Sequence, residues 1–276
     1  MSRKKSLGMS LVELMIAMAI GLVVIGSVLA FTLSSLTSNT EYVQATRLSQ
    51  ELRNSMDFVS RELRRSGYDQ NTGSKIASLT TSSTNIASPF ARISIKDVSP
   101  LVLIGTPSTA VNADDDGCVI YAYDRNDNGV GTPGVVDLDN GEIRALRLAT
   151  RTVDGLSVGV LEMAESFSAT SPDCGADGPN YTNYPPSRNA TTGWSALSDP
   201  RLLNLTAFRL ENTGYLNIPV SATSAPITMR EIGIELQGQL RRSEDGTITR
   251  GIRSDVRIRA DCLDSLANCA LAPTGT

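Results

Sequence analysis

The stretch Gly8-Met9-Ser10-Leu11-Val12-Glu13, together with the apolar run behind it, decides how this chain is organised. Residues 14–40 contain no Asp, Glu, Lys or Arg, and residues 14–33 consist almost wholly of Leu, Ile, Val, Met, Ala, Gly and Phe. About 20 apolar residues, rising 1.5 Å each, cross a hydrocarbon layer of about 30 Å. The run therefore predicts a membrane-spanning helix.

Two residues distinguish this run from a plain anchor: Gly8, which precedes it, and Glu13, which lies inside it. Gly8, a following apolar residue and Glu13 together resemble the class III signal of type IV prepilins and type II secretion pseudopilins. The resemblance implies that a prepilin peptidase cuts after Gly8 and methylates the new amino terminus on Met9. Glu13 then becomes the fifth residue of the mature chain, where the family carries its glutamate, whereas Met9 stands where the family usually has Phe.

The physical chemistry of Glu13 agrees with this resemblance. An ionised carboxylate inside a membrane is costly and normally has a partner or a function. Once residues 1–8 are removed, the next basic residue is Arg47, so Glu13 has no cation within helical reach. We expect the freed amine of Met9 on a neighbouring chain to pair with Glu13. The alternative is that Glu13 lies close enough to the interface to reach water or headgroups.

The charges near the leader predict the orientation of the chain. Arg3, Lys4 and Lys5 hold the amino-terminal end in the cytoplasm, so residues after Leu36 are exported. We expect a single-pass protein of the inner membrane with a periplasmic domain, which later reaches the pilus and the cell surface.

Composition limits the function classes. Residues 1–8 hold three of the 25 Lys and Arg, which leaves 22 against 29 Asp and Glu and argues against a general nucleic-acid binder. The chain has no His, which removes Ser-His-Asp and Cys-His catalysis and the usual zinc sites. No spacing of Asp and Glu selects a catalytic pair, so we predict that the protein is not an enzyme and requires no cofactor.

The four cysteines all follow the apolar run, in the part of the chain expected to enter an oxidising compartment. An even number of cysteines there indicates disulfides. Three connectivities are open, and we favour Cys118–Cys174 with Cys262–Cys269 because the second pair is close in the tail. Zinc ligation by four cysteines is the alternative, but no C-x-x-C spacing supports it.

The helix is predicted to continue beyond the membrane to about Ser66. Residues 41–66 lack Pro and Gly, and apolar residues recur every three or four positions, which indicates one apolar stripe. Arginines in the last turn and Gly67 after it are typical of a helix end. The stripe comprises Leu48, Leu52, Met56, Val59 and Leu63.

Beyond a solvated connection, short alternating segments separated by turn residues predict antiparallel strands. The clearest hairpin joins residues 232–237 to residues 248–258 through Asp245-Gly246, and residues 168–200 are predicted to form a long surface loop carrying Cys174 and Trp194. The other expected strands are Ala91–Ile95, Leu101–Ile104, Cys118–Tyr123, Glu142–Leu148, Leu156–Met163, Leu203–Leu210 and Tyr215–Pro219.

These elements give an α+β fold class, a long N-terminal helix packed on an antiparallel β-sheet domain, which is the pilin architecture. We predict residues 1–8 as leader, 9–36 as the transmembrane and filament-core half of the helix, 37–67 as its amphipathic half, and 68–276 as the exported β-rich domain.

Two polar features of the domain suggest binding sites. Asp124, Asn126 and Asn128, followed by Gly129, match the first half of a calcium loop, although Val135 replaces the expected Glu. The alternative is a polar turn after a strand. The C-terminal hairpin is basic, which suits binding to an acidic partner subunit. The alternative is that its charges protect an exposed strand edge from aggregation. Its arginines are Arg241, Arg242, Arg250, Arg253, Arg257 and Arg259.

The length and the turn-rich insertions make the chain most similar to the PilW-type minor pilins, relatives of the J-type minor pseudopilin of type II secretion. That resemblance implies a low-abundance subunit that primes type IV pilus assembly and stays near the tip. Its implied partners are prepilin peptidase, the inner membrane, other minor and major pilins, and a large tip adhesin. The alternatives are a secretion pseudopilin and a tip subunit with an adhesin or ligand-binding role.

Overall fold

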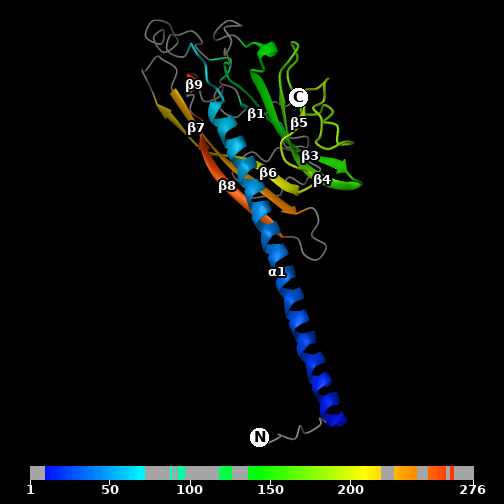
Figure 1. The fold of residues 1–276 in the computed structure, drawn as a ribbon. Coiled ribbons are helices and arrows are strands. Elements are labelled where there is room, and N and C mark those ends of the chain that lie inside the picture. The colour runs from blue at the N-terminus through cyan, green and yellow to red at the C-terminus, as the bar shows by residue number, and fades with distance from the viewer. Residues whose placement is uncertain are drawn as a thin grey trace, which may run out of the picture. The chain divides into compact units, whose positions relative to one another are not determined.

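The computed structural model describes residues 10–71, 88, 90, 93–96, 118–125, 136–218, 227–240, 248–258 and 262–263 (Figure 1). The chain divides into two compact units, Met1–Arg47 and Leu48–Thr276. One long helix, α1 (Leu11–Arg65), contributes residues to both. The leader, the processing residues Gly8 and Met9, and most of the predicted connection after the helix lie outside the described residues, and the predicted boundaries at 36 and 67 stay predictions.

In the second unit, α1 buries the apolar stripe that the sequence predicts. Leu48, Leu52, Met56, Val59 and Leu63 are all at most 2% exposed. Their spacing of three and four residues places them on one side of the helix. The helix ends at Arg65, and Gly67 adopts the left-handed backbone conformation (φ 79°) that favours glycine after a helix. The predicted stripe and the predicted end are confirmed.

The first sheet has five antiparallel strands in the order β1-β2-β3-β4-β5. Its centre is the hairpin of β3 and β4, whose two-residue turn Asp154-Gly155 has positive φ at both positions, as a tight hairpin turn requires. A short 3-10 turn, Leu138–Asn140, precedes β3. The strands are β1 (Ile93–Lys96), β2 (Cys118–Ala122), β3 (Ile143–Val153), β4 (Leu156–Glu165) and β5 (Ser195–Ala196).

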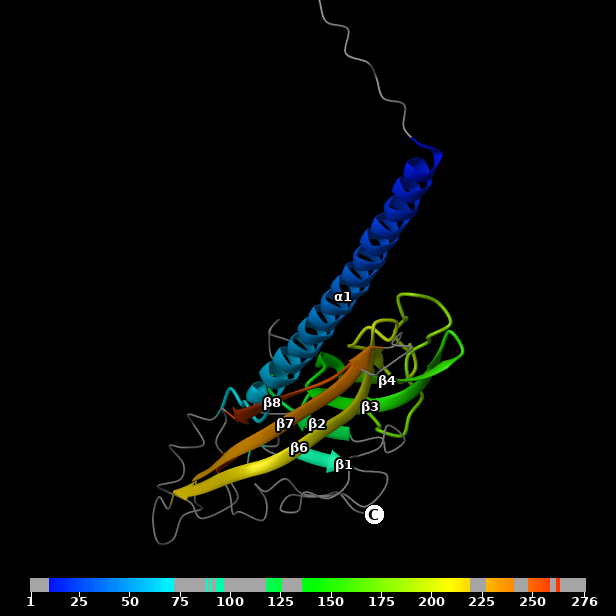
Figure 2. The ribbon, with the colours of Figure 1, turned by 90° about the horizontal axis from the view of Figure 1, so that it is seen from below.

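The second sheet contains four antiparallel strands, with β7 paired to its neighbours on both sides (Figure 2). They are β6 (Leu203–Ile218), β7 (Ile227–Leu240), β8 (Thr249–Arg257) and β9 (Cys262–Leu263). The sequence predicted two strands where β6 is one, because register shifts at Leu205/Ala207 and Asn212/Gly214 let a strand absorb irregular residues without ending. The predicted hairpin of β7 and β8 is present, whereas the predicted strand Leu101–Ile104 lies outside the described residues.

The two sheets share one hydrophobic core with the last part of α1. That core joins the helix stripe to Leu146 and Leu148 of β3, Leu205 of β6 and Ile234 of β7, all of them fully buried. The sheets meet at Gly159, where an added Cβ would overlap the carbonyl oxygen of Leu205. The predicted fold class, α+β with a long N-terminal helix and antiparallel sheet, is confirmed, but the strands form two sheets rather than one.

Candidate functional site

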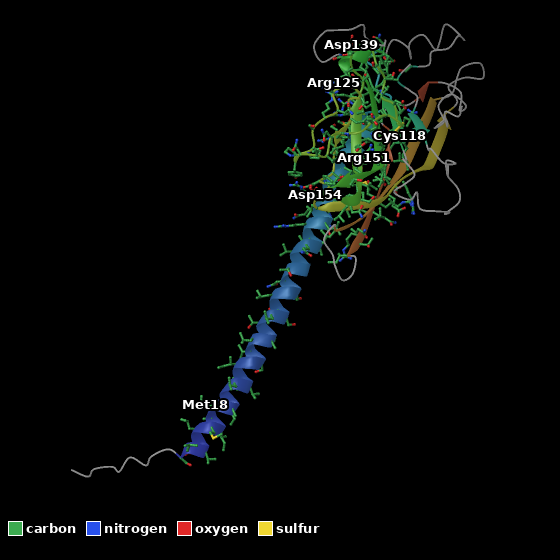
Figure 3. The ribbon with its side chains drawn as sticks, turned by 90° about the vertical axis from the view of Figure 1, so that its right-hand side faces the viewer. Met18, Cys118, Arg125, Asp139, Arg151 and Asp154 are labelled. Atoms are coloured by element: carbon green, nitrogen blue, oxygen red, sulfur yellow. A yellow bond between two sulfur atoms is a disulfide. The ribbon has the colours of Figure 1, made fainter. Side chains whose placement is uncertain are left out.

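The first part of α1 exposes its apolar side chains. None of residues 10–36 is buried, and the large apolar ones range from 51% exposed at Leu14 to 76% at Phe31. Figure 3 shows these side chains pointing outward all around the helix near Met18. Among the described residues, α1 is the one helix long and apolar enough to cross a bilayer. A surface of this size and polarity needs lipid or other apolar helices around it.

Glu13 is the only charged residue between Ser10 and Thr40, and it lies in the first turn of α1. The N–H of Leu14 donates to the carbonyl oxygen of Ser10 at 3.1 Å, so Ser10 occupies the N-cap. Ser10 and Glu13 therefore stand in the order of a capping box, and a carboxylate here also opposes the helix dipole. This position favours Glu13 within its own helix, independently of the expected pairing between chains.

The second unit contains a buried ion cluster on the helix side of the first sheet. Glu62 of α1 accepts from Nη1 of Arg144 at 2.9 Å and from the hydroxyl of Tyr121 at 3.1 Å. Arg144 also contacts Glu165 at 3.3 Å and lies 5.1 Å from the Tyr123 ring centre. Burial, followed by the negative charge of Glu62, raises the pKa of Tyr121, so that its hydroxyl remains a donor. This cluster fastens the helix to β2 and β3 by polar bonds.

A second ion cluster lies on the other face of that sheet, centred on Arg147 and Glu162, which oppose each other on β3 and β4. Nε of Arg147 donates to Glu162 at 2.8 Å, while Arg151 donates to both oxygens of Glu162, at 2.7 and 2.9 Å. Tyr181 donates to Glu162 at 2.8 Å. Burial by itself opposes ionisation, but these arginines lower the pKa of Glu162 below its usual value.

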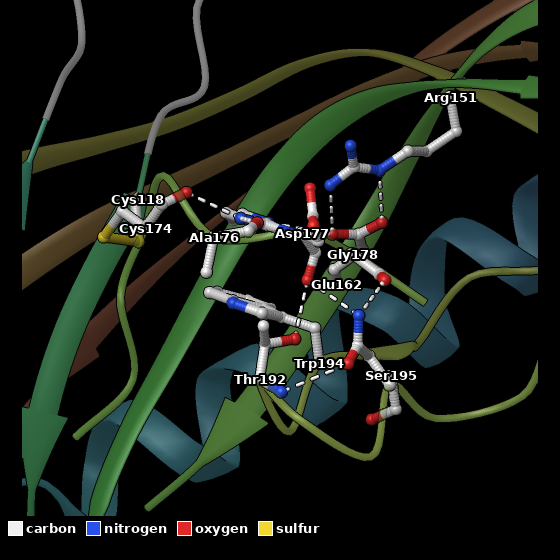
Figure 4. Close-up of polar contacts among 12 residues, drawn as sticks. Cys118, Arg151, Glu162, Cys174, Ala176, Asp177, Gly178, Thr192, Trp194 and Ser195 are labelled. Carbon is white, nitrogen blue, oxygen red and sulfur yellow. Dashed lines mark hydrogen bonds and ion pairs between the residues drawn. A yellow bond between two sulfur atoms is a disulfide. The ribbon is translucent and has the colours of Figure 1, made fainter. Parts of the chain in front are cut away.

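Residues 166–200, which we call the insertion, cover this cluster (Figure 4). Nη1 of Arg147 donates to the carbonyl oxygens of Cys174 and Ala176 at 2.6 and 2.8 Å, and its guanidinium lies 3.8 Å from the ring centre of Trp194. The indole N–H of Trp194 donates to the carbonyl oxygen of Asp173 at 3.0 Å. The insertion is thus bound to the sheet by a desolvated cation.

The predicted disulfide Cys118–Cys174 is present and joins β2 to the insertion beside this cluster. Both cysteines are buried with Trp194, which is 0% exposed. The prediction of a surface loop was therefore wrong for Cys174 and Trp194, since they pack on the second face of the sheet. The other predicted disulfide lies outside the described residues, because Cys269 is not among them.

The predicted calcium site is only partly described. The side chain of Asp124 is almost fully buried and accepts from the N–H of Gln70 at 3.1 Å, while Asn126 and Asn128 lie outside the described residues. Glu142 accepts the N–H groups of Arg125 and Asp137, so its carboxylate holds these two residues close together. No group of three His, Cys, Asp or Glu within the described segments is arranged for a metal, and calcium stays a prediction.

Sequence reasoning gave no role to Arg147 or Glu162. The turn Asp154-Gly155 could have indicated them in the sequence. The register of a hairpin closed by this two-residue turn pairs Arg147 with Glu162 and Arg144 with Glu165 across its strands. That register reveals both cross-strand charge pairs, but it does not reveal that they are buried.

Two known family models match the chain, one at its N-terminal end and one over most of the rest. A model described as the prokaryotic N-terminal methylation motif matches residues 3–29, and a model described as prepilin peptidase-dependent protein B matches residues 41–258. Searches of curated proteins and of solved structures returned no match. The second family model covers well over half of the chain and includes both ion clusters and every strand of the two sheets except β9. The chain therefore belongs to the prepilin peptidase-dependent protein B family, a group of processed, membrane-anchored, type IV pilin-like proteins.

Proposed function

We propose that this chain is a minor pilin of the PilW type that primes type IV pilus assembly and remains in the tip complex. In this proposal prepilin peptidase cuts after Gly8 and methylates Met9, and α1 holds the protein in the inner membrane with its β domain in the periplasm until assembly. Its partners are other minor and major pilins and a large tip adhesin. The protein is not an enzyme, requires no cofactor and binds no nucleic acid.

The observation that carries the proposal is the exposed apolar part of α1 with its single carboxylate. Lipid surrounds this apolar surface before assembly, and the equivalent helices of neighbouring subunits surround it afterwards. Glu13, placed five residues from the cleavage point, supplies the one charge that specifies a partner with a free amine. The match of the N-terminal methylation motif to residues 3–29 supports the same processing.

Mass spectrometry of the native N-terminus tests the proposed processing. We expect the protein purified from cells that make pili to begin with methylated Met9 and to occur both in membranes and in sheared filaments. Protein that retains Met1 through Gly8 and never enters a filament would contradict the proposal. Processed protein that depends on a secretion system rather than on pili would instead identify a J-type pseudopilin.

Replacing Glu13 tests the proposed pairing between chains. Glu13→Ala is expected to leave membrane insertion intact, because it removes a charge from the apolar run, but to lower incorporation into filaments about tenfold or more. Quantitative blotting of membrane and sheared-filament fractions measures both quantities.

Glu13→Gln is the matched control, because glutamine keeps the capping box but not the charge. Equal losses with Ala and Gln support an ion pair between chains. Normal incorporation of the Gln variant would show that Glu13 acts on its own helix instead.

A further inference from the structure

The outward face of α1 in the second unit is strongly basic. Seven residues between Leu48 and Arg65 are exposed, and four of them are arginines, whereas one is acidic. At 100° per residue, all seven lie within about one third of the helix circumference, opposite the buried stripe. The seven residues, which we call the arginine face, are Gln50, Arg53, Asn54, Asp57, Arg61, Arg64 and Arg65.

The positive charge of the arginine face is little offset by ion pairs with carboxylates of the described residues. Glu62 is turned into the protein, where Arg144 and Tyr121 bind it, and Arg65 only shares that carboxylate at 3.5 Å. No carboxylate of the described residues lies within ion-pair distance of Arg53, Arg61 or Arg64. Arg61 rests over the ring of Phe58 at 5.7 Å, which leaves its guanidinium at the surface.

This positive charge contrasts with the rest of the domain. Residues 66–276 carry 24 acidic and 17 basic side chains, and the whole chain has a net charge of −4. A solvated helix face normally mixes both signs, because like charges one turn apart repel each other. Four arginines and one aspartate on one face, in an acidic protein, favour a complementary surface that bears carboxylates.

We infer that the arginine face docks on a carboxylate-bearing surface of a neighbouring pilin-like subunit. The inference rests on the proposed function, because only a filament brings a second subunit against the outward face of α1. A domain with the acidic balance of residues 66–276 would supply such carboxylates. Guanidinium groups suit such a surface, since they bind carboxylates through two parallel hydrogen bonds.

Anionic lipid is a less favourable partner for the arginine face, because this face is far along the helix from the predicted membrane span. Arg53 follows Leu36, the last residue of the predicted span, by 17 positions, or about 25 Å of helix, whereas surface potentials decay within about 8–10 Å at physiological salt. This separation along the helix favours a protein surface over anionic headgroups as the occupant.

Charge reversal on the full-length chain, expressed in cells that make its filaments, tests the inference. The triple variant Arg53→Glu/Arg61→Glu/Arg64→Glu is expected to insert in the membrane normally and to lose about tenfold in the sheared-filament fraction. The control is Arg188→Glu/Arg201→Glu, which reverses exposed charges outside α1 and outside the C-terminal hairpin and is expected to lose far less. The triple lysine variant of the arginine face is expected to retain more incorporation than the triple glutamate variant but less than the wild type, because it keeps the charges and loses the paired hydrogen bonds.

A photo-crosslinker at Asn54, which lies within the arginine face beside Arg53, identifies the occupant directly. We expect crosslinked peptides from another filament subunit that contain Asp or Glu. Crosslinks to lipid or nucleic acid, wild-type incorporation of the triple glutamate variant, or an equal loss in the Arg188→Glu/Arg201→Glu control would each overturn the inference. Failure of the wild-type chain itself to enter filaments would instead overturn the proposed function. Trp194 fluorescence confirms that each variant is folded.

Discussion

Replacing Arg147 with methionine should lower the free energy of unfolding of the β domain by about 3 kcal/mol or more. Methionine fills much of the same volume but leaves Glu162 with a buried charge and one cation fewer, and removing one partner of a buried pair typically costs about 3–5 kcal/mol. It also leaves the carbonyl oxygens of Cys174 and Ala176 without the donor that Arg147 supplies. Because Arg151 and Tyr181 still bind Glu162, we expect the loss of unfolding free energy to lie at the lower end of this range.

Trp194 makes this loss measurable. It is the only tryptophan in the chain, it is fully buried, and it stacks on the guanidinium of Arg147. Denaturant unfolding of the full-length protein in detergent, followed by tryptophan fluorescence, therefore reports directly on this cluster. In the Arg147→Met variant we expect a lower midpoint and a red-shifted native emission, because water reaches the indole.

Two further variants separate the loss of a buried pair from a general effect of losing an arginine. Arg201→Met removes an exposed ion pair with Asp154 and should cost at most about 1 kcal/mol. Arg147→Met/Glu162→Leu removes both buried charges and should be more stable than Arg147→Met alone. If the double variant were the less stable of the two, the interpretation of Glu162 as an orphaned charge would be wrong.

The parts of this fold that the sequence predicts are those encoded locally. Leu48 and Leu63 belong to a stripe whose helical period is visible in the sequence, and Gly67 marks the end of the helix. The alternation of residues 232–237 likewise predicts β7 and its buried face. Each of these features depends on residues a few positions apart, so no knowledge of the tertiary structure is needed.

Burial of the second face of the first sheet could not be predicted in this way. Leu146, Arg147 and Leu148 alternate as in a strand with one solvated face, which predicts an exposed arginine. The insertion covers that face, and its polar sequence gives no sign of doing so. Trp194 and Cys174 dock there through contacts with residues 27 to 56 positions away, beyond the range of any local pattern. Division of the strands into two sheets is a long-range property of the same kind.

Removing the Cys118–Cys174 disulfide should destabilise the insertion by about 2–4 kcal/mol. The bridge closes a loop across a sequence separation of 56 residues, for which the chain-entropy model gives about 4 kcal/mol. The double variant Cys118→Ala/Cys174→Ala avoids placing new polar groups in a buried site. Hydrogen exchange is expected to rise across residues 166–200 while β6 and β7 stay protected, because they lie in the other sheet.

The disulfide and Arg147 should act as one unit rather than as two independent contributions. Arg147 donates to the carbonyl oxygen of Cys174, so the bridge holds in place the acceptor that the guanidinium needs. Once either is removed, the other binds a segment that is already loosened. A double-mutant cycle should therefore give a combined loss smaller than the sum of the single losses by about 1 kcal/mol or more, whereas strict additivity would mean that the insertion is held at two separate points.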